Sequence, residues 1–160
     1  MKLSTRARYA LAMMVAIARA GHNQRITLKE VSETTHKPRR YLEQLAIALK
    51  QASLITGTIG RGGGYSLTRP AAEIDVGQII EAAIGPIGVV DCVLDPESCK
   101  EAACCERRPL YSLINRRITD VLKTISLADL TEETWQDRVL LERRPVDLPT
   151  DRAHTQVRGA

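Results

Sequence analysis

The sequence predicts a mainly α-helical fold with one small β-hairpin. Aromatic residues make up only 3% of the 160 residues and Phe is absent, so the core must be built from Ala, Leu, Ile and Val. Several segments between glycines and prolines repeat apolar residues at helical spacing, and two short strand patterns flank one Gly-rich loop. With 44% hydrophobic residues, the chain suits one compact domain plus an extension.

The first helix is expected over residues 4–20. Ser4 is a favourable N-cap type, and Gly21 supplies a C-terminal stop. The basic start and the apolar residues 9–18 also resemble a secretory signal peptide. The apolar positions repeat at helical spacing with arginines off that face, however, which favours an amphipathic globular helix. We therefore expect a cytoplasmic protein. No apolar run in the sequence reaches the roughly 18 residues of a membrane span, so we expect no membrane partner.

A second and a third helix follow in quick succession. Thr27 and Glu30 have the spacing of a capping box, which predicts a helix over about residues 28–34. Pro38 suits the first turn of the third helix, residues 38–51, because it has no N–H to leave unpaired there. Two helices joined by so short a turn form a candidate helix-turn-helix.

The third helix divides into an apolar and a polar face. The face expected to pack against the first two helices carries Leu42, Leu45, Ala46 and Leu49. The side chains that a recognition helix would present to the major groove are Arg39, Arg40, Tyr41, Gln44 and Ile47. Arg pairs with guanine, Gln pairs with adenine, and Tyr donates to phosphate or packs on a thymine methyl. Taken alone, this segment also fits a three-helix bundle with a polar surface.

Two strands joined by a glycine-rich loop follow the third helix. Residues 54–59 and 65–68 have strand character, and four glycines with Arg61 connect them. Such a wing can approach the phosphate backbone or place Arg61 in the minor groove, whose negative potential attracts cations. We discount a nucleotide-binding loop because the segment lacks the Walker Lys-Ser/Thr pair.

The chain is expected to divide into four parts. A winged helix-turn-helix DNA-binding domain at residues 1–84 would end with a fourth amphipathic helix, and an irregular cysteine loop would follow at residues 85–106. Residues 107–142 contain a long C-terminal helix with the apolar positions Leu110, Leu113, Ile114, Ile118, Val121, Leu122 and Ile125. In a chain this short, that stripe has little else to cover it. We therefore expect a dimerisation helix and a homodimer, which suits palindromic DNA, and a disordered tail at residues 143–160.

Charge is distributed unevenly along the chain. Residues 1–70 carry twelve Lys or Arg against three Glu, a net charge of +9. Residues 71–160 carry eleven Lys or Arg against sixteen acidic residues, a net charge of −5. Clustered cations favour nucleic acid or an anionic membrane surface as a partner, because phosphate neutralisation is where they contribute most. A solvated basic face without a partner is the alternative.

Fourteen consecutive residues contain all four cysteines: Cys92, Cys99, Cys104 and Cys105. In a reducing compartment such a cluster is typical of a metal or redox site rather than of a disulfide framework. Thiolates bind soft metals and iron–sulfur clusters, whereas the paired C-x2-C spacing of a zinc finger is absent from the sequence. Adjacent cysteines are hard to place on one metal ion, so we expect only one of the last two to be a regular ligand. Thiols without any cofactor are the alternative.

Short stretches along residues 1–131 together resemble a known family. They are residues 1–4 with 8–10, 41–45, 62–65, 76–80, three spaced cysteines and residues 124–130. In order and spacing they resemble the bacterial regulators that include IscR, NsrR, RirA and CymR, and IscR-like members in particular. The resemblance implies a homodimeric winged helix-turn-helix repressor or activator. Many members sense iron, cluster status, nitric oxide or redox state through an iron–sulfur cluster.

The resemblance also assigns roles to positions of this chain. Tyr41 and Gln44 match recognition-helix contacts, and Glu43 matches a residue implicated in sequence discrimination. The candidate DNA contacts are then Arg39, Arg40, Tyr41, Glu43, Gln44, Arg61, Gly62, Gly63 and Tyr65. The implied ligands of a cluster, 2Fe–2S in preference to 4Fe–4S, are Cys92, Cys99 and either Cys104 or Cys105.

Three positions depart from the family pattern. Arg107 stands where IscR-like members have a His ligand, and a guanidinium that stays protonated cannot bind iron. Arg8 stands where NsrR-like members have an Asp, and Ile59 stands where IscR-like wings carry an Arg. The fourth ligand is therefore open between Glu106, the second cysteine of the adjacent pair and a small thiol.

The sequence thus predicts a DNA-binding transcription regulator whose operator affinity is controlled by an iron–sulfur cluster. One alternative is a cofactor-free, CymR-like repressor that a thiol or a partner protein controls. Others are a cytosolic metal- or cluster-handling protein without DNA binding and an RNA-binding winged helix. We do not expect an enzyme, because the sequence offers no defensible Ser-His-Asp set or paired carboxylates.

Overall fold

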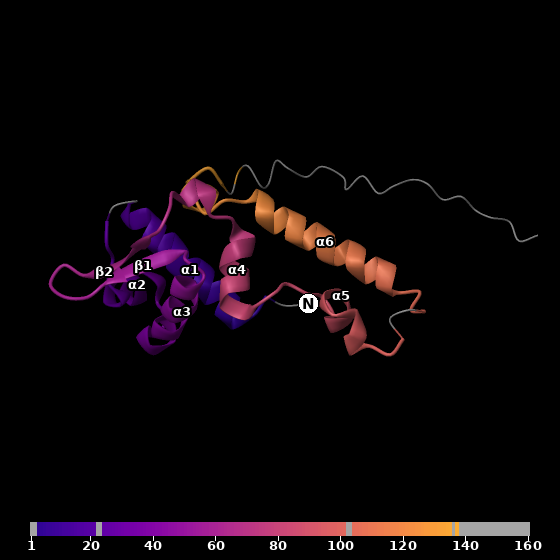
Figure 1. Cartoon of the computed structure of the whole chain (residues 1–160). Helices are drawn as coiled ribbons and strands as arrows, with labels where there is room; N and C mark the ends of the chain where they lie inside the picture. Colours follow the sequence, from indigo (N-terminus) through magenta and orange to yellow (C-terminus); the bar gives the residue numbers. More distant parts are fainter. Residues whose placement is uncertain (1–2, 22–23, 102–103, 136, 138–160) are drawn as a thin grey trace, which may run out of the picture.

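The structure is a computed structural model that describes residues 3–21, 24–101, 104–135 and 137, with a helical body at one end and a long helix at the other (Figure 1). The helices are α1 (Thr5–Ala20), α2 (Leu28–Thr35), α3 (Arg39–Gln51), α4 (Val76–Ile84), α5 (Asp91–Leu94) and α6 (Arg108–Thr124). Short 3-10 turns are η1 (Ala71–Glu73), η2 (Pro96–Ser98) and η3 (Asp129–Thr131). Strands β1 (Ile55–Thr58) and β2 (Gly64–Leu67) form a two-stranded sheet, so the predicted fold class, mainly α with a small β-wing, is confirmed.

The first helices begin where their capping residues predict. The Oγ atom of Ser4 accepts a hydrogen bond of 3.1 Å from the backbone N–H of Ala7. In the capping box of α2, the backbone N–H of Thr27 donates to Oε2 of Glu30 at 2.8 Å, and the Glu30 N–H donates back to Thr27 Oγ1 at 3.3 Å. The first of these bonds stabilises the carboxylate and lowers the pKa of Glu30. One boundary differs: Pro38 is not in the first turn of α3 but is its N-cap, in an extended conformation.

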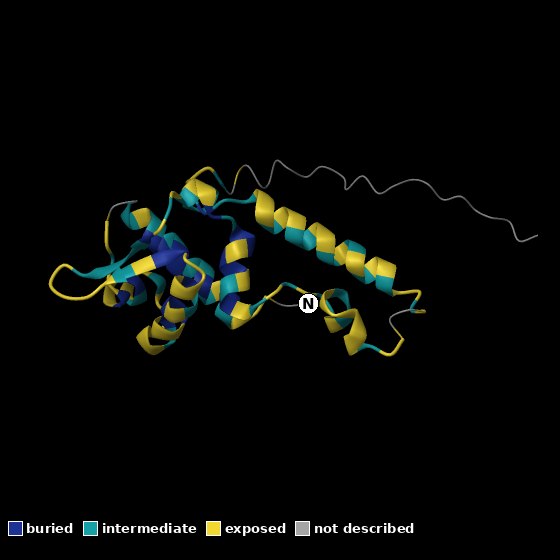
Figure 2. Cartoon of the chain, in the orientation of Figure 1, coloured by how far each residue is buried: buried dark blue, intermediate teal, exposed yellow. Residues whose placement is uncertain are grey.

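The hydrophobic core lies between α1, α2, α3 and α4, as the dark blue stripes in Figure 2 show. Its fully buried side chains include Met13, Met14, Ile17, Val31, Leu42, Leu45, Leu49 and Ile79. Among the described residues no aromatic side chain is buried, and Tyr9, Tyr41 and Tyr65 pack at the edge of the core. The expected aliphatic core is therefore confirmed for the described part of the chain.

The wing, defined here as β1, β2 and the loop between them, is attached directly to the helical body. Strands β1 and β2 pair antiparallel, with Ile55 opposite Leu67. The pairing continues to Ile26, which lies just before α2. The Ile26 N–H donates to the Tyr65 carbonyl at 3.0 Å. The Tyr65 N–H donates back to the Ile26 carbonyl at 2.9 Å. These two bonds hold the base of the wing beside the helix-turn-helix.

The cysteine segment, residues 85–106, is more regular than expected. It contains α5 and η2 rather than irregular chain alone. Asp95 and Pro96 explain the second turn: the Asp95 carboxylate accepts from the backbone N–H of Glu97 at 3.1 Å, and Pro96 takes the first position of η2. A single helical turn is too short to show a repeat of apolar residues, so the periodicity of the sequence does not predict η2.

Helix α6 begins two residues before its first predicted apolar position, and none of its residues, all of which the structure describes, is buried. The chain then returns to the helical body. The Val76 N–H donates to the Ile125 carbonyl at 2.9 Å, and the Leu127 N–H donates to the Ile74 carbonyl at 2.7 Å. Leu127 is fully buried in the core. Residues 125–127 therefore fasten the end of α6 to the start of α4.

The predicted disordered tail at residues 143–160 lies outside the described residues, as does most of the chain from residue 136 to 142. In the described part of the chain, every helix is too short or too polar to cross a membrane.

Candidate nucleic-acid interface and cysteine segment

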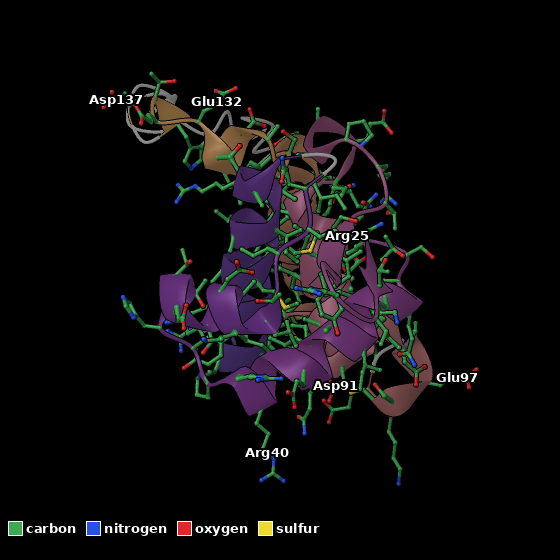
Figure 3. All side chains as sticks on the ribbon, turned by 90° about the vertical axis from the view of Figure 1, so that its left-hand side faces the viewer. Arg25, Arg40, Asp91, Glu97, Glu132 and Asp137 are labelled. Carbon is green, nitrogen blue, oxygen red and sulfur yellow. The ribbon has the colours of Figure 1, made fainter. Side chains whose placement is uncertain are left out.

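Most of the predicted recognition residues lie on the exposed face of α3. Arg39, Arg40, Glu43 and Gln44 are exposed, and Ile47 is 60% exposed. Arg40 extends away from the body of the protein in Figure 3. Arg39 and Glu43 form an i,i+4 ion pair of 3.2 Å, and both side chains remain at least half exposed. Exposed pairs of this kind contribute little stability, so DNA phosphates can compete for the arginine at small cost.

Tyr41 differs from this pattern. The sequence places it among the outward-facing residues, but the structure shows it half-buried and packed against the edge of the core. Its ring meets the ring of Tyr9 in an edge-to-face contact with centroids 5.3 Å apart. Tyr41 lies one helical turn before the buried Leu45, so it stands at the border between the buried and the exposed face of α3. A neighbouring aromatic ring on α1 packs against it there.

The predicted wing contacts fall into two groups. Arg61 and Gly62 are exposed in the loop, and Ile59 beside them is fully exposed. Tyr65 is instead half-buried at the base, where its ring lies 3.1 Å from the position that a Cβ on Gly57 would occupy. Gly63 also has a structural reason to be glycine, because a Cβ there would come within 2.3 Å of the Thr58 carbonyl oxygen. The glycines thus allow the backbone of the loop to turn tightly, and Arg61 is exposed on it.

Replacing Gly64 by alanine is expected to loosen the wing. Gly64 has φ +152°, and a Cβ there would lie 2.8 Å from the backbone oxygen of Ile26, across the pairing that attaches the wing. We expect G64A to lower the free energy of unfolding by about 1 to 3 kcal/mol. Thermal unfolding by circular dichroism measures this. Gly60→Ala is the control, because Gly60 also has a positive φ but no atom within 4 Å of a Cβ. Equal destabilisation by the two variants would contradict the steric explanation.

The four predicted cysteine ligands lie along the segment between α4 and α6. Cys92 is on α5, Cys99 follows η2, and Cys104 and Cys105 precede α6. All four are free thiols, of which only Cys104 is exposed and the others are half-buried. Among the described residues, no three His, Cys, Asp or Glu side chains gather closely enough to hold a metal ion. The structure therefore supplies the donors on one segment without bringing them to one point.

Cys105 is chemically distinct from the other thiols. Two hydrogen bonds from Arg107 lower the pKa of the Cys105 thiol. The larger effect comes from the backbone N–H of Arg107 and the smaller one from its guanidinium. Arg107 also lies 3.9 Å from Glu101, and both line an open cavity of about 390 Å³ with Cys104, Cys105 and Glu106. Arg107 therefore favours a thiolate, which is the form that binds soft metals. In its chemistry, this donor set fits an iron–sulfur cluster.

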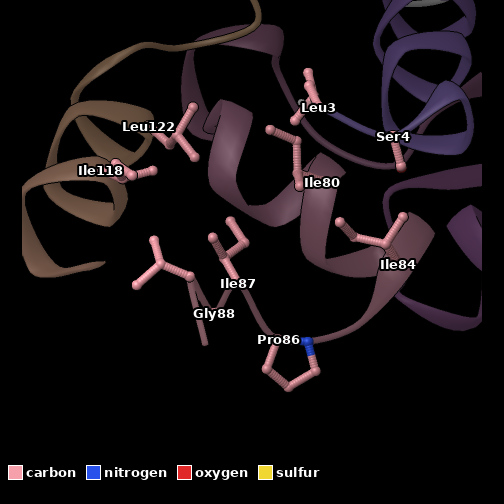
Figure 4. A pocket seen from close by; sticks show the side chains of 10 residues that line it. Leu3, Ser4, Ile80, Ile84, Pro86, Ile87, Gly88, Ile118 and Leu122 are labelled. Atoms are coloured by element: carbon pink, nitrogen blue, oxygen red, sulfur yellow. The ribbon is translucent and has the colours of Figure 1, made fainter. Parts of the chain in front are cut away.

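Two contacts lie on either side of the start of the cysteine segment, one with α6 and one between α1 and the end of α4. The Val89 N–H donates to Oδ1 of Asn115 on α6 at 3.0 Å. At the end of α4, the Arg6 side chain from α1 donates to the Ala83 carbonyl. Between these contacts lies an apolar cavity of about 270 Å³, shown in Figure 4, with Ile80 and Ile84 from α4 and Ile118 and Leu122 from α6 among its lining. The segment thus leaves the helical body beside a space that is not tightly filled.

A helix-turn-helix with exposed arginines and a wing paired to its base defines a winged-helix DNA-binding protein of the transcription-regulator class. The family model Rrf2, described as an iron-dependent transcriptional regulator, matches residues 3–133. The chain belongs to this Rrf2 family, whose members are regulators and not enzymes.

Similar proteins include regulators named IscR and CymR. The chain is 33% identical to the regulator IscR of Erwinia tasmaniensis over 81% of this chain and 78% of that protein. The solved structure of CymR, the global cysteine regulator of B. subtilis, is 32% identical with a TM-score of 0.68, over 82% of this chain and 96% of that one. The structure of IscR from T. potens is 26% identical with a TM-score of 0.65, over 91% and 93% of the two chains. The chain is therefore similar both to IscR regulators and to CymR.

Proposed function

We propose that this chain is a homodimeric regulator that binds a palindromic operator with an affinity set by an iron–sulfur cluster on the cysteine segment. The observation that carries the proposal is the donor set. Four free thiols lie on one short segment, and Arg107 favours the thiolate of one of them. That segment connects α4, which is part of the DNA-binding body, to α6.

Cys92, Cys99 and one of Cys104 and Cys105 would hold the cluster, with 2Fe–2S favoured over 4Fe–4S. When bound, the cluster supplies iron–thiolate bonds that iron shortage, oxidants or nitric oxide can break. The chain's own residues prepare the ligands: Arg107 holds Cys105 toward the thiolate, and Asn115 holds the start of the segment against α6. The proposal includes a rearrangement of residues 85–106 that brings the thiols together.

On the DNA side, α3 and the wing would contact different parts of the duplex. Arg40 and Gln44, which are exposed on α3, would contact base edges in the major groove, and Arg61, which is exposed on the wing loop, would contact the backbone or the minor groove. The net charge of +9 over residues 1–70 supports phosphate binding around both elements. Arg39 would exchange its partner Glu43 for phosphate or guanine.

Cluster and operator would be linked through the contacts around α4. A cluster that changes the position of the cysteine segment would act on the end of α4 and the residues that follow it. Arg6 binds the Ala83 carbonyl at the end of α4, and Asn115 binds the Val89 N–H in the segment. Linkage requires that each ligand changes the affinity for the other by the same factor. A coupling typical of allosteric proteins gives an affinity change of about five- to 150-fold.

The visible absorption spectrum of protein purified without oxygen, followed by operator titration with and without cluster, tests the proposal. Wild-type protein should be brown, and its operator affinity should change by at least about fivefold when the cluster is removed. Cys92→Ser should be colourless and should bind the operator equally well under both conditions. Cys104→Ser and Cys105→Ser form a matched pair, of which one should keep its colour. Colourless wild-type protein after reconstitution, or equal operator affinities with and without cluster, would contradict the proposal.

A cofactor-free regulator of the CymR kind is the second candidate. It is favoured by the absence of a converged ligand set among the described residues and by the structural likeness to CymR. In this case the cysteines or a partner protein would carry the signal. Iron and sulfide analysis of reconstituted protein separates the candidates, because this one predicts no stoichiometric iron and unchanged operator binding.

A further inference from the structure

We propose that Tyr9 is a positioning residue for DNA recognition: its ring fixes the orientation of Tyr41 on the recognition helix. The inference rests on the proposed function together with the sequence-based expectation that Tyr41, half-buried at the start of the recognition helix, is an operator contact. Tyr9 lies on α1, which is outside the helix-turn-helix and carries none of the predicted operator contacts.

The contact between the two rings is specific in its geometry. Their centroids are 5.3 Å apart and their planes are inclined by 73°, an edge-to-face arrangement. Both side chains are half-buried and pack against the core formed by α1, α2 and α3. An edge-to-face pair is favoured over a face-to-face stack because the positive edge of one ring meets the negative face of the other. The pair therefore restricts the rotamer of Tyr41 before DNA arrives.

The turn before the recognition helix is attached to the same ring. The Lys37 ammonium lies 4.9 Å from the centroid of the Tyr9 ring, within cation–π range. The Ser32 hydroxyl donates to the Lys37 carbonyl at 2.6 Å, which ties the turn to α2. His36, with φ +54°, ends α2 just before it. Tyr9 thus contacts both the turn between the two helices and the first turn of α3.

This arrangement affects discrimination rather than general DNA affinity. A side chain that is already held in one orientation loses less conformational freedom on binding, so it contributes more to the complex that needs that orientation. Of the two contacts open to Tyr41, we take the thymine methyl rather than a phosphate. Binding to an unrelated duplex then depends on phosphate contacts from other side chains, which need no particular orientation of Tyr41. Loss of the Tyr9 ring should therefore lower the ratio of operator affinity to non-operator affinity.

The test is a double-mutant cycle on full-length protein. Two duplexes are titrated by fluorescence anisotropy: one selected from a random library by the wild-type protein, and one of scrambled sequence. The variants are Tyr9→Phe, Tyr9→Leu, Tyr41→Leu and the double Leu variant. Tyr9→Phe is the matched control because it keeps the ring. Tyr9→Met replaces Tyr9→Leu if the latter does not unfold cooperatively on heating.

We expect Tyr9→Leu to weaken binding of the selected duplex by about three- to tenfold, which corresponds to the usual range for an aromatic pair. Binding of the scrambled duplex should stay within about twofold, and Tyr9→Phe should match the wild type on both duplexes. In the Tyr41→Leu background, Tyr9→Leu should have no further effect on the affinity ratio.

Three results would overturn the inference alone: equal losses on both duplexes, the same loss for Phe as for Leu, or independent effects in the cycle. A different result bears on the proposed function. If Tyr41→Leu by itself leaves the affinity ratio unchanged, Tyr41 is not an operator contact, and both the assignment of Tyr41 and the role of Tyr9 are wrong.

Discussion

Raising the salt concentration from about 50 to 200 mM should weaken operator binding by about 10³- to 10⁵-fold. The reason is counterion release: a protein that neutralises roughly 6 to 10 phosphates returns that many condensed cations to solution. A dimer that presents two copies of α3 and of the wing has enough exposed arginine and lysine for this number, given a net charge of +9 over residues 1–70. Fluorescence anisotropy titrations at several salt concentrations give the slope of log affinity against log salt.

Two arginine variants test whether the salt dependence of operator binding arises from α3. Arg40→Ala removes an exposed cation from the recognition helix and should lower the magnitude of the slope by about one for each phosphate that the variant no longer neutralises. Arg116→Ala removes an equally exposed cation from α6 and should leave the slope unchanged. A slope near zero for the wild type would mean that the basic half is a solvated surface. Equal effects of the two variants would mean that the DNA does not lie on α3.

The elements with strong local signals could be predicted from the sequence. Ser4, the Thr27–Glu30 capping box and Gly21 fix helix ends through bonds between residues a few positions apart, and such bonds form wherever the local chain is helical. The periodic apolar face of α3 is similarly local, and its predicted members are buried. These features needed no knowledge of the rest of the chain.

Features that depend on distant contacts were not predictable in the same way. Leu127 is fully buried because residues 125–127 return to the start of α4, a contact between segments about fifty residues apart. Tyr41 turns inward because Tyr9 lies beside it on another helix. The periodicity of a segment shows which of its faces is apolar. It does not show which other segment packs against that face.

The cysteine segment shows the same division between chemistry and geometry. Residue type and spacing indicate soft-metal donors, and Arg107 cannot bind iron because its guanidinium stays protonated. Its interaction with the Cys105 thiol appears only in the structure, because it depends on how the chain enters α6. Four closely spaced cysteines specify which atoms are available, whereas the fold of residues 85–106 decides whether they converge.

Substituting Val121 by glutamate on α6 should separate the proposed homodimer and weaken operator binding by about 10²- to 10⁴-fold. Val121 is 56% exposed and Leu110 is 55% exposed, and both belong to the apolar stripe of α6. Figure 2 shows only exposed and half-buried residues along this helix. A continuous apolar face without buried residues is stabilised when a second copy covers it, and a charge placed on that face opposes the burial. Without the dimer, two half-sites no longer bind as one unit.

Ser112→Glu provides the matched control, because Ser112 lies on the opposite side of α6 and is also exposed. Sedimentation equilibrium should find a dimer for the wild type and for S112E, and a monomer for V121E. Far-UV circular dichroism should show the same helix content in all three, since the helical core does not include Val121. A dimeric V121E protein would place the subunit contact elsewhere. A monomeric V121E protein with full operator affinity would show instead that each subunit recognises DNA independently, and the palindromic operator would lose its physical basis.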